Sequence, residues 1–503
     1  MSNLFDRLSR NTPDLSVRAI ENIDGTIYSY GDLFALSAQI AHVLVAQGVK
    51  PGDRVAAQVE KSVPALVLYL ATVRAGAVYL PLNTAYTLAE LDYFIGDAEP
   101  SLIICDPSSE KGIRELAEKV GAKVLTIDPA GKGSLVSAAS LQSKEFATVP
   151  RSGDDLAAIL YTSGTTGRSK GAMLTHDNLH SNAATLVEYW RFTSRDVLIH
   201  ALPIYHTHGL FVASNVTFFS GASMIFLPKF DPEKIMELMA RATCLMGVPT
   251  FYVRLLQHPK LDKQAVKNMR LFVSGSAPLL ADTHREWSAK TGHAILERYG
   301  MTETNMNTSN PYDGDRVPGA VGYPLPGVCV RIADPENGKL LAPDEIGMIE
   351  VKGPNVFKGY WRMPEKTQAE FKPDGFFITG DLGKIDARGY VHIVGRGKDL
   401  IITGGFNVYP KEIESEIDAL PGVFESAVIG VPHPDFGEGV TAVVVRTKPD
   451  QIDEKSIIAA LQDRLAKFKQ PKKIIFMDDL PRNTMGKVQK NVLRDQFANL
   501  YTG

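Results

Sequence analysis

The sequence predicts an α/β protein in two parts: a large N-terminal domain of layered β-sheets with helices, and a small α+β C-terminal domain. Its 503 residues exceed what one hydrophobic core usually serves. Apolar runs of strand length alternate with helical patterns through most of the chain, which is typical of helices packed on parallel sheet. The Gly-rich segment GRGKDLIITGGFNVYP (395–410) then indicates a hinge between apolar stretches. We therefore expect domains at 1–396 and 397–503.

The large domain is predicted from nine apolar runs of strand length. In order they are RVAAQVE (54–60), AVYLPL (77–82), LIICD (102–106), KVLTI (123–127), LAAILYT (156–162), DVLIHALP (196–203), SMIFLP (223–228), LFVSGSA (271–277) and AILERYG (294–300). The most apolar stretch, ALVLYLATVRAGAVYL (65–80), is broken by Arg74 and Gly76 well before the roughly 20 residues that span a bilayer. It predicts a buried helix followed by a buried strand.

The small domain is predicted from a helix signal and three apolar runs. Pro410 suits the first position of a helix, Ile413, Ile417 and Leu420 recur at helical spacing, and Pro421 ends the pattern. Strands SAVIGV (426–431), TAVVVR (441–446) and KIIFMD (473–478) follow, with a helix through Ile458, Leu461 and Leu465 before the last of them. About 100 residues suffice for an independent domain.

Charge and the chain ends limit the partners and the compartment. Lys and Arg number 54 and Asp and Glu 57, so the net charge of −3 provides no bulk field for nucleic acid or an anionic membrane. The start, MSNLFDRLSRN, lacks a signal-peptide pattern, and the final YTG is no peroxisomal address. We expect a cytoplasmic protein with no membrane or nucleic-acid partner and no obligate protein partner.

The segment YTSGTTGRSKG (161–171) follows a strand-like run and predicts a phosphate site. Successive backbone N–H groups and hydroxyls make an anion-binding concavity, to which Lys170 adds a point charge. A Walker A loop counted from Gly164 would need Gly at Ser169 and Ser or Thr at Gly171. A different nucleotide chemistry is therefore indicated.

Six motifs together resemble the adenylate-forming superfamily of acyl-CoA synthetases, adenylation domains and luciferases. They are YTSGTTGRSKG, SGSAP (274–278), ERYGMTET (297–304), FFITGDLG (376–383), GRGKDLIITGGFNVYP and PRNTMGKVQK (481–490). Within the superfamily the chain is most similar to malonyl-CoA synthetases. The resemblance implies that malonate attacks the α-phosphate of ATP, that pyrophosphate leaves, and that CoA then takes the acyl group from the adenylate. Malonate, ATP and CoA would be the substrates, with methylmalonate as an alternative acid.

The same resemblance implies roles for individual residues. Lys487, Lys170, Thr302 and His206 would be catalytic. ATP would be bound by Thr162, Ser163, Gly164, Thr165, Thr166, Gly167, Lys170, Ser276, Ala277, Pro278, Glu297, Tyr299, Gly300, Met301, Thr302, Asp381, Arg396 and Lys487, with Arg168 close to the phosphates. Glu303 would bind Mg²⁺, and Gly404, Gly405 and Phe406 would serve the thioester step. Lys398 would be the hinge about which the small, mobile domain rotates between the two steps.

The acid site is expected to be small and polar. The segments IYHTHG (204–209) and TETNMNTSN (302–310) would line it, with His206, Thr207, His208, Ser276 and Met306 around the acid. Malonate carries a second carboxylate that needs a buried cation. The candidates are Arg254, in VPTFYVRLL (248–256), and Arg285; either could equally be a surface arginine whose stem packs on apolar neighbours.

Three alternatives remain at this point. The chain could be a ligase for acetate or another short acid, an adenylating enzyme that loads a carrier protein, or a catalytically silent nucleotide-binding relative. The chain ends about fifteen residues after Lys487 with no carrier domain, which favours free CoA as the acceptor. Lys487, Glu303, Asp381 and Arg396 are all present, which disfavours the silent relative.

Overall fold

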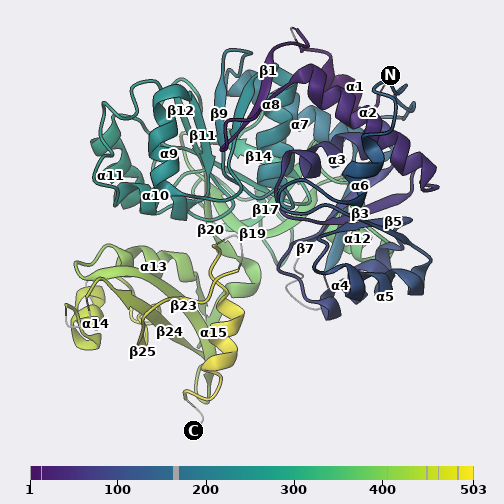
Figure 1. Cartoon of the computed structure of the whole chain (residues 1–503). Coiled ribbons are helices and arrows are strands. Elements are labelled where there is room, and N and C mark those ends of the chain that lie inside the picture. The colour runs from purple at the N-terminus through teal and green to yellow at the C-terminus, as the bar shows by residue number, and fades with distance from the viewer. Residues whose placement is uncertain are drawn as a thin grey trace.

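A computed structural model gives the chain a large lobe and a small lobe that meet near β19 and β20 (Figure 1). It describes residues 2–12, 14–162, 169–404, 406–448, 451–462, 464–483 and 486–501. The described residues form three sheets in the large lobe and one in the small lobe. The predicted α/β class is confirmed, with layered sheets in the large lobe and an α+β small lobe.

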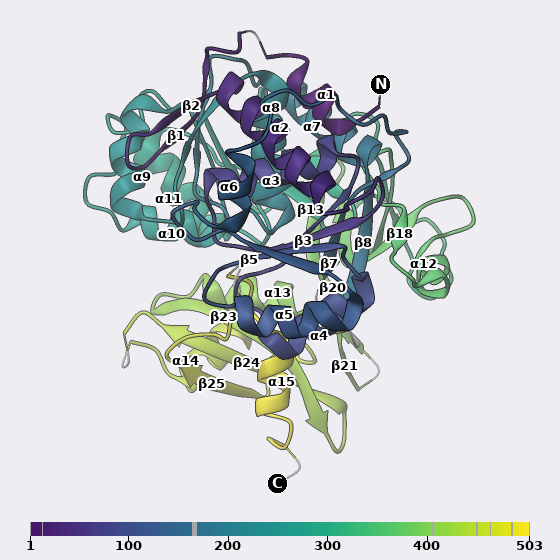
Figure 2. The ribbon, with the colours of Figure 1, turned by 45° about the vertical axis from the view of Figure 1, so that its right-hand side comes forward.

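The first large sheet has the strand order β18-β8-β7-β4-β3-β5-β6, and its five consecutive strands from β7 to β6 pair in parallel. Its strands are β3 (Arg54–Gln58), β4 (Val78–Pro81), β5 (Leu102–Cys105), β6 (Lys123–Thr126), β7 (Leu156–Thr162), β8 (Lys170–Thr175) and β18 (Gly359–Tyr360). Helices α4 (Leu88–Ala98) and α5 (Glu110–Val120) cover the outer face, as Figure 2 shows. Five of the nine predicted strand runs lie here.

The second large sheet has the order β15-β14-β13-β12-β11-β9-β10-β1-β2, and its central strands are parallel. Its strands are β1 (Arg18–Asn22), β2 (Ile27–Ser29), β9 (Val197–His200), β10 (Ser223–Phe226), β11 (Cys244–Gly247), β12 (Leu271–Ser274), β13 (Leu296–Met301), β14 (Asn305–Ser309) and β15 (Tyr323–Pro324). The other four predicted runs fall on β9, β10, β12 and β13. Because parallel strands end at one edge, loops after β9, β11 and β12 gather there.

Alternation along the strands of the first sheet assigns side chains to two cores. Val55 and Ala57 of β3 join the main core, whereas Ala56 joins the core beneath α4 and α5. Helix α3 (Val63–Arg74) belongs to the main core and is buried along its length up to Val73. This explains the long apolar run, which is a buried helix followed by a buried strand, as predicted.

The remaining helices of the large lobe pack around these sheets. They are α1 (Leu4–Ser9), α2 (Tyr30–Ala46), α6 (Ser134–Ala139), α7 (His176–Tyr189), α8 (Asn215–Ser220), α9 (Pro232–Leu238), α10 (Pro249–Leu256), α11 (Ala281–Thr291) and α12 (Pro364–Glu370), with a 3₁₀ turn η2 (Met239–Arg241). A π-helix, η1 (His208–Ser214), leads directly into α8. π-Helical segments are rare in proteins as a whole, and those that do occur are often found at functional sites.

The small lobe follows a four-stranded antiparallel sheet of β16 (Cys329–Ala333), β17 (Gly347–Lys352), β19 (Phe377–Ile385) and β20 (Val391–Arg396). A 3₁₀ turn, η3 (Gly397–Asp399), leads from β20 into the small lobe. The small lobe contains β21 (Ile401–Thr403), β22 (Phe406–Val408), α13 (Pro410–Asp418), β23 (Val423–His433), β24 (Gly437–Arg446), α14 (Glu454–Gln462), β25 (Lys473–Met477) and α15 (Lys490–Gln496). Pro410 opens α13 as predicted, but the helix ends at Asp418, before Leu420.

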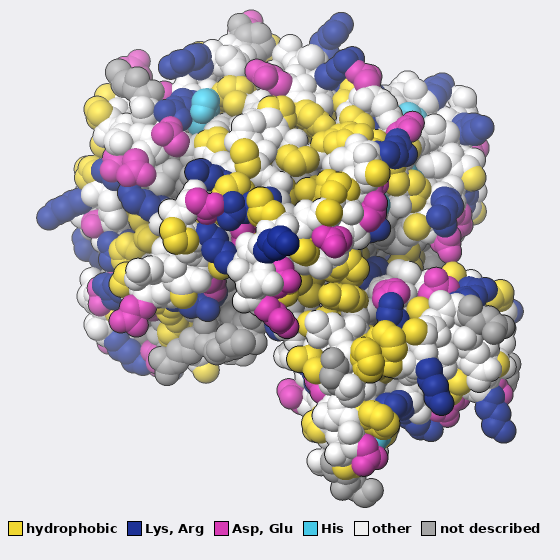
Figure 3. Space-filling view, turned by 180° about the vertical axis from the view of Figure 1, so that it is seen from behind, with side chains coloured by type: hydrophobic (Ala, Val, Ile, Leu, Met, Phe, Trp, Pro, Cys, Tyr) yellow, Lys and Arg dark blue, Asp and Glu magenta, His cyan; other side chains and the backbone are white. Residues whose placement is uncertain are grey.

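The surface shows no segregation of charge on the face seen from behind. Figure 3 shows Lys and Arg side chains interspersed with Asp and Glu side chains there, and a cleft between the two lobes. Among the described residues, no helix is both long enough and apolar enough to cross a membrane.

Candidate active site

The predicted phosphate loop joins β7 to β8. Thr162 ends β7, Lys170 begins β8, and the two residues are cross-strand partners. The loop residues predicted to bind phosphate, Ser163, Gly164, Thr165, Thr166 and Gly167, and the neighbouring Arg168, lie outside the described residues. Thr162 itself ends β7, which pairs in parallel with β4, and α/β sheets bind ligands at this end of their parallel strands.

Lys170 lies among aromatic and acidic side chains that the sequence analysis did not identify. Its Nζ is 3.0 Å from Glu370 Oε1 and 4.1 Å from the centre of the Tyr360 ring. The Tyr360 hydroxyl donates to Glu370 Oε2 at 2.7 Å. Glu370 and Tyr360 thus hold the Lys170 ammonium beside the loop.

Glu303 has the surroundings of a carboxylate that accepts a cation. It is buried, its Oε1 lies 3.1 Å from the Tyr360 hydroxyl, and burial raises its pKa. No lysine, arginine or histidine of the described residues forms an ion pair with it. Mg²⁺ held mainly by phosphates and water needs only one or two protein carboxylates. Glu303 therefore fits the predicted Mg²⁺ site.

Three residues predicted to bind the nucleoside lie together at the junction of the lobes. The Tyr299 hydroxyl donates to Asp381 Oδ2 at 2.6 Å, and Arg396 Nε lies 2.8 Å from Asp381 Oδ1. Asp381 of β19 and Arg396 of β20 are also cross-strand partners. The register of two antiparallel strands therefore fixes this carboxylate against this guanidinium.

Lys487 reaches the same place from the small lobe. Burial, and then the Arg396 charge, lowers its pKa to about 8, while Asp381 and Asp399 act in the opposite direction. A Cβ on the neighbouring Gly486 would lie 3.5 Å from Thr250 of α10, in ordinary contact. The loop that carries Lys487 is thus packed against the large lobe.

A second group, the His–Arg cluster, comprises His206, His208, Ser276 and Arg298. His208 Nδ1 lies 3.2 Å from Ser276 Oγ. Burial, and then the Arg298 charge, lowers the pKa of His206 to about 4 and that of His208 well below its usual value. Both imidazoles are therefore neutral at physiological pH, and Arg298 supplies the positive charge of the cluster.

Arg298 is a buried cation that forms no ion pair with a carboxylate of the described residues. It lies on β13 with 4% of its surface exposed, and its Nε and Nη2 have no hydrogen-bond partner among the described residues. Burial lowers its pKa to about 9, so it stays mostly protonated at neutral pH. A Cβ on Gly275 would lie 2.3 Å from Arg298 Cζ, so the glycine makes room for the guanidinium. Such a charge is costly unless an anion pairs with it.

The prediction of Arg254 or Arg285 as the buried cation is wrong. Arg254 is exposed on α10, with its guanidinium 6.0 Å from the centre of the Phe230 ring. Arg285 is 65% exposed and pairs with Asp282 on the same helix. Both lie on outward faces of helices. Arg298 lies within the run AILERYG, which predicts a buried strand, and a cation inside such a strand is the sequence signal that could have identified it.

Two other predicted acid-site residues lie on segments that adjoin the cluster in the chain or sheet: Thr207 between His206 and His208, and Met306 opposite Gly300 of β13. Thr207 and Met306 are each 2% exposed, and Thr207 Oγ1 has no partner among the described residues. The methyl carbon of Met306 lies 2.6 Å from where a Cβ on Gly300 would stand. Ser276 adopts φ +72°, which is uncommon for a residue with a side chain and is typical of strained functional loops.

The remaining predicted nucleotide residues differ in their surroundings. Ala277, Met301 and Thr302 are partly buried and Pro278 is exposed. Glu297 belongs to a separate hydrogen-bonded group, because its Oε1 lies 2.9 Å from His284 Nδ1 and accepts the Gly319 N–H at 3.2 Å. The Glu297 carboxylate is thus held by His284 and Gly319, and its contact with ATP stays a prediction.

The residues predicted for the thioester step lie on the small lobe. Gly404 donates its N–H to Phe436 O at 2.9 Å, and Phe406 is 54% exposed, stacked on Phe468 with ring centres 4.6 Å apart. Gly405 lies outside the described residues. The predicted hinge, Lys398, lies in the η3 turn between the lobes.

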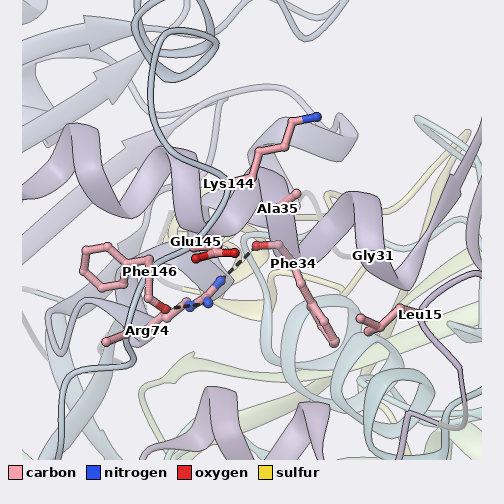
Figure 4. Close-up of a pocket in the computed structure, with 9 residues that line it drawn as sticks. Leu15, Gly31, Phe34, Ala35, Arg74, Lys144, Glu145 and Phe146 are labelled. Carbon is pink, nitrogen blue, oxygen red and sulfur yellow. Dashed lines mark hydrogen bonds between the residues drawn. The ribbon is translucent and has the colours of Figure 1, made fainter.

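A surface hollow elsewhere in the large lobe does not belong to this site. Figure 4 shows it between α2 and the segment 144–147, with Arg74 at its base. The Arg74 guanidinium donates to Phe34 O at 2.8 Å, Ser37 Oγ at 2.8 Å and Phe146 O at 2.6 Å. Both terminal nitrogens of its guanidinium thus donate within the fold, which gives this arginine a structural role.

A lysine that flanks the predicted phosphate loop, the pair of Asp381 and Arg396, and a buried arginine with two nitrogens unpartnered among the described residues suit an enzyme that binds a nucleotide and a carboxylic acid side by side. The chain belongs to the AMP-binding enzyme family, whose model matches residues 5–361, and the model of the AMP-binding enzyme C-terminal domain matches residues 412–487.

Individual relatives cover almost the whole chain. A malonate–CoA ligase of Arabidopsis thaliana is 34% identical over 98% of this chain and 88% of its own length. The ATP-bound crystal structure of MatB from Rhodopseudomonas palustris is 73% identical over 99% of both chains, with a TM-score of 0.98. Apo MatB from the same organism, also 73% identical over 99% of both chains, gives 0.87. The arrangement of this chain therefore resembles the ATP-bound relative more than the apo one.

The unpaired charge of Arg298 predicts an unusual effect on stability. Arg298→Met should raise the free energy of unfolding by about 1–4 kcal/mol, because it replaces a buried, uncompensated cation with an apolar side chain. Thermal and denaturant unfolding of the purified protein would measure this change.

Arg270→Met is the matched control, because Arg270 is also largely buried but its Nε lies 2.7 Å from Asp196 Oδ1. Its loss leaves the buried Asp196 unpaired and should destabilise the protein by about 3–5 kcal/mol. If both variants lose stability alike, Arg298 is not an uncompensated charge.

Proposed function

We propose that this chain is an ATP-dependent malonyl-CoA synthetase. An oxygen of one malonate carboxylate attacks the α-phosphorus of ATP, the bond from that phosphorus to the bridging oxygen breaks, and pyrophosphate leaves. The thiol of CoA then attacks the acyl carbon, the bond to the adenylate oxygen breaks, and AMP leaves. The observation that carries the choice of acid is the buried, unpaired guanidinium of Arg298.

Charge balance favours a dicarboxylic acid. His206 and His208 are neutral, so the His–Arg cluster carries the single charge of Arg298. Malonate brings one carboxylate to react and a second to pair with that charge, and a bidentate arginine–carboxylate pair is strong. Acetate would leave the guanidinium unpaired. The malonate–CoA ligase and MatB relatives support the same substrate.

Thr207 lies between His206 and His208 in the chain, and Met306 of β14 lies opposite Gly300 of β13, the strand of Arg298. These two side chains would set the space around the second carbon of the acid. Both are buried, and the Thr207 hydroxyl has no partner among the described residues. We propose that they decide how well methylmalonate is accepted, because a methyl branch must fit against these two side chains.

In the adenylation step the chain mainly positions charge. Lys170 and the loop it flanks would hold the leaving pyrophosphate, Asp381 and Arg396 the ribose, and Lys487 the reacting carboxylate and α-phosphate. Glu303 would hold Mg²⁺, which supplies positive charge to the phosphate oxygens when bound. His206 and Thr302 would contact the reacting groups.

The thioester step requires a different placement of the small lobe. Lys487 is half-buried at the junction while Phe406 is exposed, so one arrangement presents only the first of them. We propose that residues 397–503 rotate about Lys398 to bring Gly404, Gly405 and Phe406 to the adenylate. The difference in TM-score between the ATP-bound and apo relatives supports mobility of this kind.

The function is tested by ATP- and CoA-dependent release of AMP and pyrophosphate with acetate, propionate, malonate, methylmalonate, succinate and benzoate. Malonate should be preferred over acetate by about 10⁴-fold in kcat/KM, because acetate leaves Arg298 unpaired. Preference for acetate or benzoate would refute the malonate assignment but keep adenylation. No AMP with any acid would refute the enzyme itself.

Lys487→Ala should separate the two half-reactions. Adenylation should fall by at least about 100- to 1,000-fold, because a cation aimed at the developing charge is lost. Thioester formation from supplied malonyl-adenylate should fall far less, since Lys487 has then left the junction. Equal losses in both steps would contradict the rotation.

The pH dependence of kcat/KM gives an independent test of the role of Lys487. With a pKa of about 8, Lys487 loses its proton as pH rises through that value, so kcat/KM for ATP in adenylation should fall above it. Lys487→Arg keeps its charge and should lack this alkaline limb.

A further inference from the structure

Lys61 is a buried lysine that the reaction as described does not use. It precedes α3, is 8% exposed, and forms no ion pair with a carboxylate among the described residues. Its Nζ lies 2.9 Å from His200 Nδ1 and 2.8 Å from His200 O, and 4.3 Å from the centre of the Phe226 ring. Burial lowers its pKa well below the usual value. Lysine is almost never fully buried without a pairing partner.

The other side of the His200 ring contacts the π-helix. His200 Nε2 lies 2.9 Å from Gly209 O, and Ser214 Oγ donates to the same carbonyl at 2.9 Å. Because Nδ1 faces the donor Lys61, Nε2 carries the hydrogen and donates to Gly209 O. A chain of hydrogen bonds, each donated in the same direction, therefore runs from Lys61 through His200 to Gly209.

Gly209 directly follows the predicted acid-binding residues. His208 and Gly209 begin η1, and a Cβ on Gly209 would lie only 2.0 Å from Pro203 O, so the backbone turns tightly here. Fixing the Gly209 carbonyl fixes the segment that carries His206, Thr207 and His208. These hydrogen bonds also connect this segment to the first large sheet, because Lys61 follows β3 of that sheet, whereas His200 ends β9 of the second sheet.

We propose that Lys61, acting through His200, is a positioning residue that holds residues 206–209 against Arg298 and thereby sets the affinity for the acid. This inference rests on the proposed function and goes beyond it, because Lys61 contacts neither the His–Arg cluster nor the Asp381–Arg396 pair. A residue that orders only the acid side of the site affects the acid and leaves ATP recognition intact.

The test is a KM comparison for Lys61→Met, which keeps the stem length but removes the donor. KM for malonate should rise about 10- to 100-fold, as expected for the loss of a buried hydrogen-bond chain. KM for ATP should stay within about twofold of wild type, since no ATP contact is changed. Equal rises of both KM values would show a merely structural role and overturn the proposal.

Tyr69→Phe is the matched control. Tyr69 lies on α3, the helix that follows Lys61, is fully buried, and donates its hydroxyl to Asn215 Oδ1 at 3.1 Å, one residue beyond the π-helix. Its loss should reduce stability without changing KM for malonate. A rise equal to that of Lys61→Met would contradict a specific role for the Lys61–His200 chain.

A double-mutant cycle tests whether Lys61 acts through His200. His200→Phe should raise KM for malonate as Lys61→Met does, and the double variant should be no worse than either single one. Additive effects would overturn the proposal. If Lys61→Met fails to fold, His200→Phe interrupts the same chain and takes its place. Wild-type enzyme without malonate preference would instead refute the proposed function, whatever the variants do.

Discussion

The Arg298 guanidinium is the constraint on which the acid side of the structure depends. It is buried, two of its nitrogens have no partner in the part of the chain that the structure describes, and its pKa of about 9 leaves it charged at neutral pH. Gly275 has no side chain because the guanidinium occupies the space of its Cβ. The histidines beside it remain neutral, so the site keeps one positive charge that a substrate carboxylate can neutralise. Such an unpaired buried charge costs stability in the free protein, and a bound carboxylate would offset that cost.

The architecture explains how this charge comes to lie beside a nucleotide site. Parallel strands of the second sheet end at one edge, where the loops after β9 and β12 supply His206, His208 and Ser276. The hairpin of β19 and β20 supplies Asp381 and Arg396, and the small lobe adds Lys487. The acid-side and nucleotide-side residues named above are thus positioned by the sheets of the large lobe. Of these residues, Lys487 belongs to the small lobe, which is the part proposed to rotate.

The sequence predicted the fold class and the motif-borne residues better than the acid site. Tyr299, Asp381 and Arg396 could be named because each lies in a short motif with a recognisable pattern, and the structure brings them together. Arg298 was missed because burial depends on which strands are neighbours: its room comes from Gly275, on the loop after β12. Lys61 and His200 are 139 residues apart, so no local pattern could have paired them.

The central claim is that Arg298 recognises the second carboxylate. The most direct measurement is the ratio of kcat/KM for malonate to kcat/KM for isovalerate, in which an isopropyl group replaces that carboxylate. This ratio is measured for wild type and for Arg298→Met. The account predicts a wild-type ratio of about 10⁴ or more that falls by at least about 10³-fold in the variant. A ratio unchanged by the substitution would contradict the account and place the recognition of malonate elsewhere.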